Sequence, residues 1–366
     1  MLVFVAGIKN LSNFAASKRN PKGKCDCWSL RLVWSGRQVF ILVTRVQIPE
    51  RLQARRTSGL FLYLCSMKKL QVIVSDQYNP YLNLAVETWL TDHQEEGVVT
   101  MYLWKNQQTV VIGLNQNPFS ECDVKRLNEE GGHLMRRRTG GGAVYHDLGN
   151  LNFSFIADKQ DYDVRRQQSV IQEALKTFGL EAEISGRNDL TCQGRKFSGN
   201  AFFNGTANNL HHGTILIKTD GEMMQRYLTV DSSKLQKHGV KSVRSRVVNL
   251  SELADITSDN IVKPLIQAFE NVYGMKAEIV DFEKIVCFEE VKETVTRISS
   301  HDYLYGKWEH FKAVKKTQFP WGNVEVGFEV DENTRKIKNV IIATDSLNTE
   351  ITDICNDIFG LLDLKI

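Results

Sequence analysis

The sequence lacks any apolar stretch long enough to cross a bilayer. A membrane-spanning helix needs roughly 18 or more consecutive apolar residues, and the apolar run at 40–43 is far shorter. Cysteine is also scarce, because the seven cysteines are scattered over 366 residues and are odd in number. We therefore expect no membrane association and no disulfide framework, and a reducing, cytoplasmic location fits. Cys25 and Cys27 lack the second ligand pair of a zinc site.

Acidic residues are nearly absent from the first 66 positions. This segment has 11 Lys and Arg against 2 Asp and Glu, whereas the rest of the chain has 35 against 41. Such a split indicates a basic extension on an independent domain. It could be a targeting presequence, a nucleic-acid-binding arm, or the translation of sequence upstream of the true start. We favour the third, because 45–49 matches a translated transfer-RNA T-arm and Met67 precedes the first predicted strand. We expect residues 1–66 to be non-native or disordered.

Apolar periodicity from Met67 onward alternates between strand and helix patterns, and 42% hydrophobic residues suffice for one large core and a smaller one. The pattern predicts strands over 71–74, 99–104, 109–112 and 150–155, and helices over 80–93 and 170–178. We expect 99–104 and 109–112 to form a hairpin. We also expect 150–155 to pair with the segment before it, across a glycine-rich turn.

Beyond about residue 280 the pattern changes to a helix over 288–298, followed by the segments 308–311, 324–330 and 337–342, which indicates a short helix-and-hairpin module. The predicted fold class is therefore α/β (α+β), with mixed or antiparallel sheets flanked by helices. The predicted domains are the extension 1–66, a main domain over 67–280 and a small α+β domain over 281–366.

The segment 136–150 (Arg-Arg-Arg-Thr-Gly-Gly-Gly-Ala-Val-Tyr-His-Asp-Leu-Gly-Asn) carries the strongest chemical signal. Arginine suits a phosphate because its planar fork donates two parallel hydrogen bonds and keeps its charge. Consecutive glycines let the backbone approach a ligand and turn several N–H groups toward an anion. A basic hairpin tip with a flexible turn is the alternative interpretation.

A second segment, 194–201 (Gly-Arg-Lys-Phe-Ser-Gly-Asn-Ala), places Lys196 beside a turn of small residues. A fixed ammonium there offsets the repulsion between a carboxylate and a phosphate, most strongly in the transition state of acyl-adenylate formation. A solvated lysine beside a turn is the alternative. The two segments together favour an enzyme that activates a carboxylate.

From Met67 to Leu347 the chain resembles bacterial lipoate–protein ligases of the A type, within the biotin/lipoate A/B protein ligase superfamily. The motifs that carry the resemblance occur in the family's order and spacing: Asn83–Glu87, Val110–Gly113 with Asn117 and Pro118, the glycine segment, Ser185–Leu190, Arg195–Gly199, His211–Thr214 and Ser242–Leu250. The resemblance implies a catalytic domain of the biotin/lipoyl-ligase type over 67–280, followed by a small accessory domain over 281–366. We expect this last domain to be shortened, because the chain stops earlier than is usual for the type.

The resemblance also implies an ATP-dependent reaction. Lipoate is joined to ATP to give lipoyl-AMP, and a lysine of a lipoyl domain then takes the lipoyl group. The expected acceptors are lipoyl domains of 2-oxoacid dehydrogenase E2 subunits and the glycine cleavage H protein. The expected ligands are ATP, Mg²⁺ and lipoate. We expect no nucleic-acid partner and a monomer.

The resemblance assigns each role to matching positions. Lys196 is the expected catalytic residue and touches both the lipoyl carboxylate and the α-phosphate. The positions expected to bind ATP are Arg137, Gly142, Ala143, Val144, Tyr145 and Lys196. The positions expected to bind lipoate are Lys196, Gly141, Gly142 and His212.

Other positions have open interpretations. Asn188 and Asp189 could position Mg²⁺, which favours one or two carboxylates plus substrate oxygens, or Asp189 could cap a turn. Adjacent histidines on a strand point to opposite faces, so we expect one of His211 and His212 beside the lipoyl tunnel and the other at the surface. His146 and Asp147 are expected to stabilise their turn.

The lipoyl pocket should be a narrow apolar cleft, which Phe153, Phe202 and Phe203 could help line; ordinary core packing of each is the alternative. A local basic patch near 136–138 is expected to attract an acidic acceptor domain. Arg244 and Arg246 suit either a loop that closes over the adenylate or a solvated face.

Rival functions are an ATP-independent lipoyl or octanoyl transferase, a biotin ligase, and a non-catalytic module that binds lipoyl domains. A transferase would use a cysteine nucleophile, and Cys192 lies near Lys196 in sequence, without the usual setting. A biotin ligase would show a Gly-Arg-Gly-Arg type loop, which the sequence lacks.

Overall fold

The computed structural model describes residues 67–186, 188–229, 247–306, 308–311, 313–319, 321–330 and 337–350, and the backbone of 27–35 and 38–46. The chain divides into two units, Met1–Leu64 and Cys65–Ile366. In the first unit, β1 (Cys27–Ser35) and β2 (Gln38–Val46) pair antiparallel. The other expectations for residues 1–66, for Arg244 and Arg246, and for the chain's last 16 residues concern positions outside this description.

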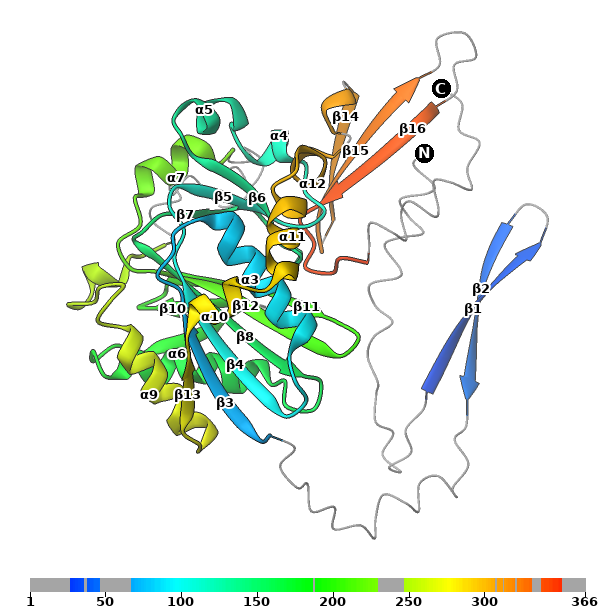
Figure 1. The fold of residues 1–366 in the computed structure, drawn as a ribbon. Helices are drawn as coiled ribbons and strands as arrows, with labels where there is room; N and C mark the ends of the chain where they lie inside the picture. The colour runs from blue at the N-terminus through cyan, green and yellow to red at the C-terminus, as the bar shows by residue number, and fades with distance from the viewer. Residues whose placement is uncertain are drawn as a thin grey trace. The chain divides into compact units, whose positions relative to one another are not determined.

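An eight-stranded mixed sheet forms the centre of the second unit (Figure 1). Its order is β13-β3-β4-β8-β12-β11-β10-β9. The pairs β13–β3 and β3–β4 are parallel and the others are antiparallel. The strands are β3 (Lys69–Val74), β4 (Val98–Trp104), β8 (Asn150–Asp158), β9 (Ala182–Ser185), β10 (Asp189–Cys192), β11 (Arg195–Asn204), β12 (Asn208–Leu216) and β13 (Ala277–Val280). The predicted class, α/β with mixed sheets flanked by helices, is confirmed.

Strand alternation divides the interior into two cores, one on each face of this sheet. In β8, Leu151, Phe153 and Phe155 join the first core, and Ile156 joins the second. Successive side chains of a strand point to opposite faces, so Asn152 and Ser154 lie on the second face. Both are almost completely buried. The second face therefore carries polar side chains at the middle of the molecule.

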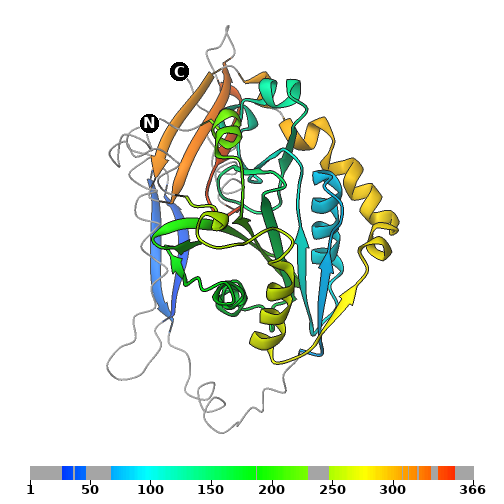
Figure 2. The same cartoon turned by 90° about the vertical axis from the view of Figure 1, so that its left-hand side faces the viewer.

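Helices cover both faces. The apolar stripes of α6 (Val164–Lys176) and α9 (Val262–Tyr273) pack into the first core, and α3 (Pro80–His93) packs into the second. Figures 1 and 2 show α11 (Glu289–Ile298) beside α3. Helix α3 begins where the Asn79 side chain accepts hydrogen bonds from the N–H groups of Tyr81 and Leu82. The shorter helices are α4 (Pro118–Glu121), α5 (Val124–Glu129), α7 (Gly221–Tyr227), η4 (Leu250–Glu252), α10 (Phe282–Val286), α12 (His301–Tyr305) and η5 (Trp308–His310).

A second, three-stranded sheet lies against the second core. Its order is β6 (His133–Arg136), β5 (Thr109–Ile112) and β7 (Val144–His146). The predicted hairpin of 99–104 and 109–112 is wrong, because the chain leaves the large sheet at Trp104 and starts the small sheet at Thr109. The linking residue Asn106 is buried and hydrogen-bonded to Asn83 of α3. The predicted pairing of 150–155 with the preceding segment is also wrong, since β8 pairs with β4 and β12.

The C-terminal part forms a three-stranded meander of β14 (Ala313–Phe319), β15 (Gly322–Val330) and β16 (Ile337–Thr344). The carboxylate of Glu325 accepts hydrogen bonds from Asn117 Nδ2 at 3.1 Å and Ser120 Oγ at 2.7 Å. The meander is thus bonded to the start of α4. The segment 308–311 consists of the turn η5 and Phe311 and lies outside the meander. No helix among the described residues is long and apolar enough to cross a membrane.

One glycine shows how tightly strand β8 is joined to β12. The carbonyl of Gly149 accepts hydrogen bonds from the N–H groups of Ile217 and Lys218. A Cβ at position 149 would lie only 2.1 Å from the carbonyl oxygen of Lys218. A side chain there would force the two segments apart.

We therefore expect Gly149→Ala to lower the free energy of unfolding by about 1–3 kcal/mol, the usual cost of overpacking. Gly221→Ala is the control, because a Cβ there meets no atom of the described residues within 4 Å. Chemical denaturation of both variants checks this. An equal stability of the two variants would contradict the close approach at Gly149.

Candidate functional site

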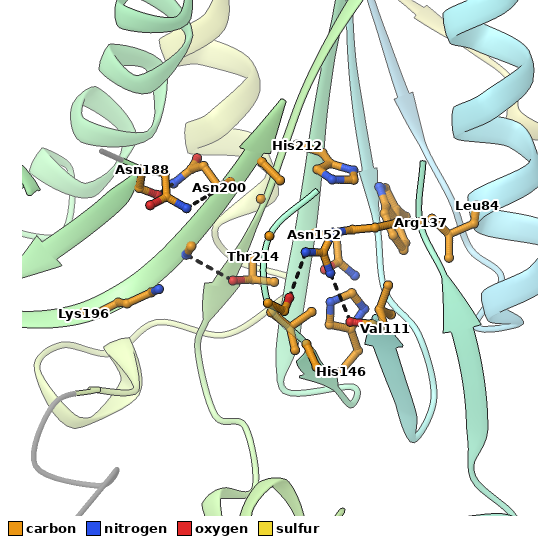
Figure 3. Close-up of a pocket in the computed structure, with 18 residues that line it drawn as sticks. Leu84, Val111, Arg137, His146, Asn152, Asn188, Lys196, Asn200, His212 and Thr214 are labelled. Carbon is orange, nitrogen blue, oxygen red and sulfur yellow. Dashed lines mark hydrogen bonds between the residues drawn. The ribbon is translucent and has the colours of Figure 1, made fainter. Parts of the chain in front are cut away.

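A cavity of about 170 Å³ lies between the second face of the large sheet and the three-stranded sheet. The large sheet contributes Trp104, Asn152 and Thr214, and the small sheet and its glycine turn contribute Val111, Gly142 and Val144, among others. Figure 3 shows Lys196 on one side of this pocket and Arg137 on the other, with Thr214 and Asn152 between them. The two cationic residues singled out in the sequence therefore line one pocket.

The pocket follows a row of residues that crosses the strands at a right angle. Thr214 of β12 faces Asn152 of β8, which in turn faces Trp104 of β4. On the other side, the Thr214 hydroxyl accepts a hydrogen bond from the N–H of Gly199 in β11. All four line the pocket. The row spans three strand spacings, roughly 14 Å.

Lys196 lies at the β11 end of this row. A Cβ added at Gly199 would be 3.1 Å from Lys196 Nζ, so the ammonium sits directly over that glycine. Nζ also pairs with Asp189 Oδ1 of the neighbouring strand at 2.7 Å. The side chains are 39% and 35% exposed, so the pair stands at the rim, where a ligand anion can compete for the ammonium.

Arg137 is buried and bonded to the turn that follows it. Its guanidinium donates to Thr139 Oγ1 and to the carbonyl oxygens of Val111, Gly140 and Gly142, at 2.7–3.2 Å. Burial is the main influence on the Arg137 pKa and lowers it to about 10, so the group stays charged at neutral pH. The expected phosphate-binding arginine thus binds the glycine turn and adds a positive charge to the pocket wall.

The glycine turn presents most of the predicted positions to the pocket. Gly141, Gly142, Ala143 and Val144 all line it. Gly141 has φ +92°, a conformation that favours glycine. Its N–H donates to the carbonyl of Ser346 at 2.9 Å. Tyr145 does not line the pocket, because the alternation of β7 turns its ring onto Tyr227 in the second core.

His212 joins a buried chain of hydrogen bonds. Its Nδ1 lies 2.8 Å from Glu87 Oε1 and its Nε2 lies 2.8 Å from Thr139 Oγ1. The same Glu87 oxygen accepts a bond from Ser154 at 2.5 Å. Glu87 thereby ties α3, the large sheet and the glycine turn together beside the pocket.

His211 points to the opposite face, as the alternation predicts. The expectation that it reaches the surface is wrong, because α6 covers that face and Gln167 Oε1 lies 2.9 Å from its Nδ1. The same geometry decides between the two interpretations of Phe153 in favour of core packing. Phe153 points into the first core, and Phe202 and Phe203 do not line the pocket either.

The expected basic patch at 136–138 is also wrong. Arg136 is buried and donates to the carbonyls of Gly113, Leu114, Gln116, Tyr303 and Leu304. Arg138 is partly exposed, pairs with Asp92 at 2.8 Å and lies over the ring of Phe203. Arg136 and Arg137 therefore bind backbone carbonyls in the interior, and they present no charged surface to a partner.

The residues proposed for a metal lie on the Lys196 side. Asn188 lines the pocket, and its amide donates to the carbonyl of Asn200. Asp189 supplies one carboxylate beside Lys196. Among the described residues, no three His, Cys, Asp or Glu side chains cluster to hold a metal ion. A single carboxylate does fit Mg²⁺ that also binds phosphate oxygens and water.

Several pocket residues carried no assignment in the sequence analysis: Trp104, Asn152, Asn200 and Thr214. A signal was present for Asn152, since Asn150, Asn152 and Ser154 alternate with apolar residues in a strand that is buried throughout. Polar residues on one face of a buried strand indicate a polar cavity, because unpartnered polar groups are costly inside a protein. Asp147 stabilises its turn as expected, accepting from the N–H groups of Gly149 and Asp220.

Residues 79–270 match the family model of the lipoyl protein ligase A/B catalytic domain. The chain belongs to this family. Lipoate–protein ligase A of Bdellovibrio bacteriovorus is 41% identical over 294 residues, which cover 78% of this chain and 86% of that protein.

Two solved structures are similar in fold and sequence. LipL1 of P. falciparum in complex with lipoate has a TM-score of 0.68 and 32% identity, over 81% of this chain and 91% of that one. A bipartite lipoate protein ligase of Thermoplasma acidophilum, determined in a study of the ligase and its E2 lipoyl domain, has a TM-score of 0.58 and 26% identity, over 66% and 97%. The family resemblance found in the sequence is confirmed.

The contacts of Arg137 lead to a stability prediction for this family fold. Replacing Arg137 by Met leaves several buried carbonyls without a charged donor, and each such loss costs about 1–3 kcal/mol. We expect Arg137→Met to lower the free energy of unfolding by at least about 3 kcal/mol. Its neighbour Arg138 has one partly exposed ion pair, so Arg138→Met should cost about 1 kcal/mol or less. Urea denaturation compares the two variants, and similar losses for both would count against the structural role of Arg137.

Proposed function

We propose that this protein is an ATP-dependent lipoate–protein ligase, which forms lipoyl-AMP and transfers the lipoyl group to a lysine of a lipoyl domain. One observation carries the proposal: Lys196 and the turn held by Arg137 line the same pocket, with the row of Thr214, Asn152 and Trp104 leading away from Lys196. An anion-binding rim and a channel for an acyl chain are what carboxylate activation requires.

In the first step a lipoate carboxylate oxygen attacks the α-phosphorus of ATP, and the bond from that phosphorus to the pyrophosphate oxygen breaks. The Lys196 ammonium lies where carboxylate and phosphate meet, and it offsets their repulsion as charge builds in the transition state. The amides of Gly142, Ala143 and Val144 are the proposed nucleotide contacts. Mg²⁺ bound by Asp189 and the phosphates would neutralise part of the phosphate charge.

In the second step the amine nitrogen of a lysine on the acceptor attacks the acyl carbon, and the bond from that carbon to the AMP oxygen breaks. The amine loses a proton, and AMP leaves. We propose lipoyl domains of 2-oxoacid dehydrogenase E2 subunits and the glycine cleavage H protein as acceptors. The similarity to an archaeal ligase that was studied with its E2 lipoyl domain supports the first.

We propose a cytoplasmic location, because the cysteines are few and scattered in the sequence and the described ones are free thiols. The small α+β domain over 281–366 is proposed as an accessory domain. Its boundary with the catalytic domain stays a prediction.

A cysteine-dependent transferase fits the pocket less well. Cys192 is buried, and burial raises its thiol pKa, the opposite of what an attacking thiolate needs. Cys122 is buried too, with a thiol pKa raised to about 12. Neither lines the pocket. Lys196 does line it, where its charge can offset the repulsion of the two anions that adenylate formation brings together.

The experiment that separates these functions is lipoate-dependent exchange of labelled pyrophosphate into ATP. A ligase gives exchange with lipoate in the absence of any acceptor domain, because the first step is reversible. A transferase or a non-catalytic binding module gives none, and a biotin ligase responds only to biotin. Absence of exchange with purified, folded protein would refute the proposed function.

Removal of the Lys196 amine tests the central charge. We expect Lys196→Ala to lower the exchange rate about 10²–10³-fold, the range for loss of one preorganised electrostatic group. Lys125→Ala is the matched control, because that side chain is 85% exposed and should leave the rate unchanged. Normal exchange by the Lys196 variant would show that another group neutralises the reacting anions.

The carboxylate of Asp189 tests the proposed Mg²⁺ position. Asp189→Asn keeps the shape and removes the charge, so we expect half-maximal exchange to need about tenfold more Mg²⁺ with ATP held constant. Titration of Mg²⁺ at fixed ATP measures this shift. If the exchange rate changes and the Mg²⁺ requirement does not, Asp189 acts only as the ion-pair partner of Lys196, and the proposed Mg²⁺ position is wrong.

A further inference from the structure

The far half of the pocket contains two buried polar atoms for which the described part of the chain supplies no hydrogen-bond partner. Neither His146 Nε2 nor Asn152 Nδ2 has a hydrogen-bond partner among the described residues, and both residues line the pocket. The two side chains are 3% and 1% exposed. Buried polar groups are nearly always hydrogen-bonded, so two such atoms facing one cavity indicate that a ligand completes them.

The hydrogen-bond network identifies the His146 nitrogen as a donor. Asn83 Nδ2 donates to the carbonyls of Gln77 and Lys105, which can only accept, and this fixes the orientation of the Asn83 amide. The two hydrogens of Asn83 Nδ2 are shared among these two carbonyls and Asn106 Oδ1, which lies 3.1 Å away. Asn106 Nδ2 is therefore the atom 3.3 Å from His146 Nδ1, and Nδ1 accepts its proton. In a neutral imidazole the other nitrogen then carries the hydrogen.

His146 is neutral across the working range of pH. Burial first and the Arg137 charge second lower its pKa to about 3. Its Nε2–H consequently stays a neutral donor. The Asn152 carbonyl oxygen accepts from Asn150 Nδ2 at 2.8 Å, which leaves the Asn152 NH₂ group for the pocket.

The distance from Lys196 places these donors near the end of a bound acyl chain. Asn152 lies two strand spacings from Gly199, roughly 10 Å, and the His146 ring contacts Trp104 one strand further on. In an extended eight-carbon acid, C6 to C8 lie roughly 6–9 Å from the carboxyl carbon, because each bond of about 1.5 Å advances the zigzag chain by about 1.25 Å. Lipoate carries its two sulfurs on C6 and C8.

We propose that His146 Nε2 and Asn152 Nδ2 form a donor pair that selects acyl chains with hydrogen-bond acceptors at C6 and C8 over plain alkyl chains. The proposal rests on the proposed function. A disulfide sulfur is a weak acceptor, but it satisfies a buried donor better than a methylene group does. Octanoate fills the same space and leaves both donors unpaired. Discrimination by one such contact is of the order of tenfold.

The test compares the dissociation constants of lipoate and octanoate by calorimetry, which needs no ATP. We expect the wild-type protein to bind lipoate at least about tenfold more tightly. Asn152→Leu, which keeps the volume and removes the donor, should reduce this ratio about 3- to 10-fold, chiefly by tighter octanoate binding. His146→Phe is the second variant and should act in the same direction.

Asn209→Leu is the matched control. Asn209 is buried in the same sheet on β12 and does not line the pocket. The ratio of lipoate to octanoate affinity in this variant should therefore equal that of the wild type. A lipoate-to-octanoate affinity ratio unchanged in both pocket variants would overturn the inference. That result is also the one expected if the two donors stay hydrogen-bonded to a bound water and not to the ligand. Lipoate-dependent pyrophosphate exchange is measured in parallel, so loss of the proposed function and loss of the selectivity are seen separately.

Discussion

The hydrogen bonds from the Arg137 guanidinium to the glycine turn are the interaction on which the site depends. A flexible run of glycines has no side chains to fix it, and a buried charge needs several partners. The carbonyls of Gly140 and Gly142 accept hydrogen bonds from the Arg137 guanidinium, and the same bonds hold the glycine turn in one conformation. The result is a shaped backbone surface with a positive charge behind it. Lys196 faces that surface from the rim.

Strand alternation provides the rest of the pocket. The large sheet has an apolar face against α6 and α9, and a second face that mixes apolar and polar side chains. Thr214, Asn152 and Trp104 fall in one row because their strands are in register. Such a row forms a channel across the strands, closed above by the small sheet. A long, thin ligand with one anionic end fits this geometry.

The fold class, the helix at 80–93 and the two chemical segments were predictable from the sequence, because caps, periodicity and the glycine run are local signals. The role of the arginine run was not, since three adjacent charges look alike until burial separates them. Arg136 and Arg137 are inside and Arg138 is outside. The wrong prediction of a hairpin between 99–104 and 109–112 has a similar cause. The short link between the two strands favours a turn, and the sequence does not show that Asn106 in this link is buried where the chain crosses from one sheet to the other.

The most direct measurement is a crystal structure with a non-hydrolysable lipoyl-adenylate analogue. The account predicts that Lys196 Nζ leaves Asp189 and lies within hydrogen-bond distance of both the acyl carbonyl and the phosphate. The acyl chain should run along Thr214 and Asn152 toward Trp104, with Arg137 still bonded to the turn. An analogue bound with its phosphate away from Lys196, or with its chain outside this row, would contradict it.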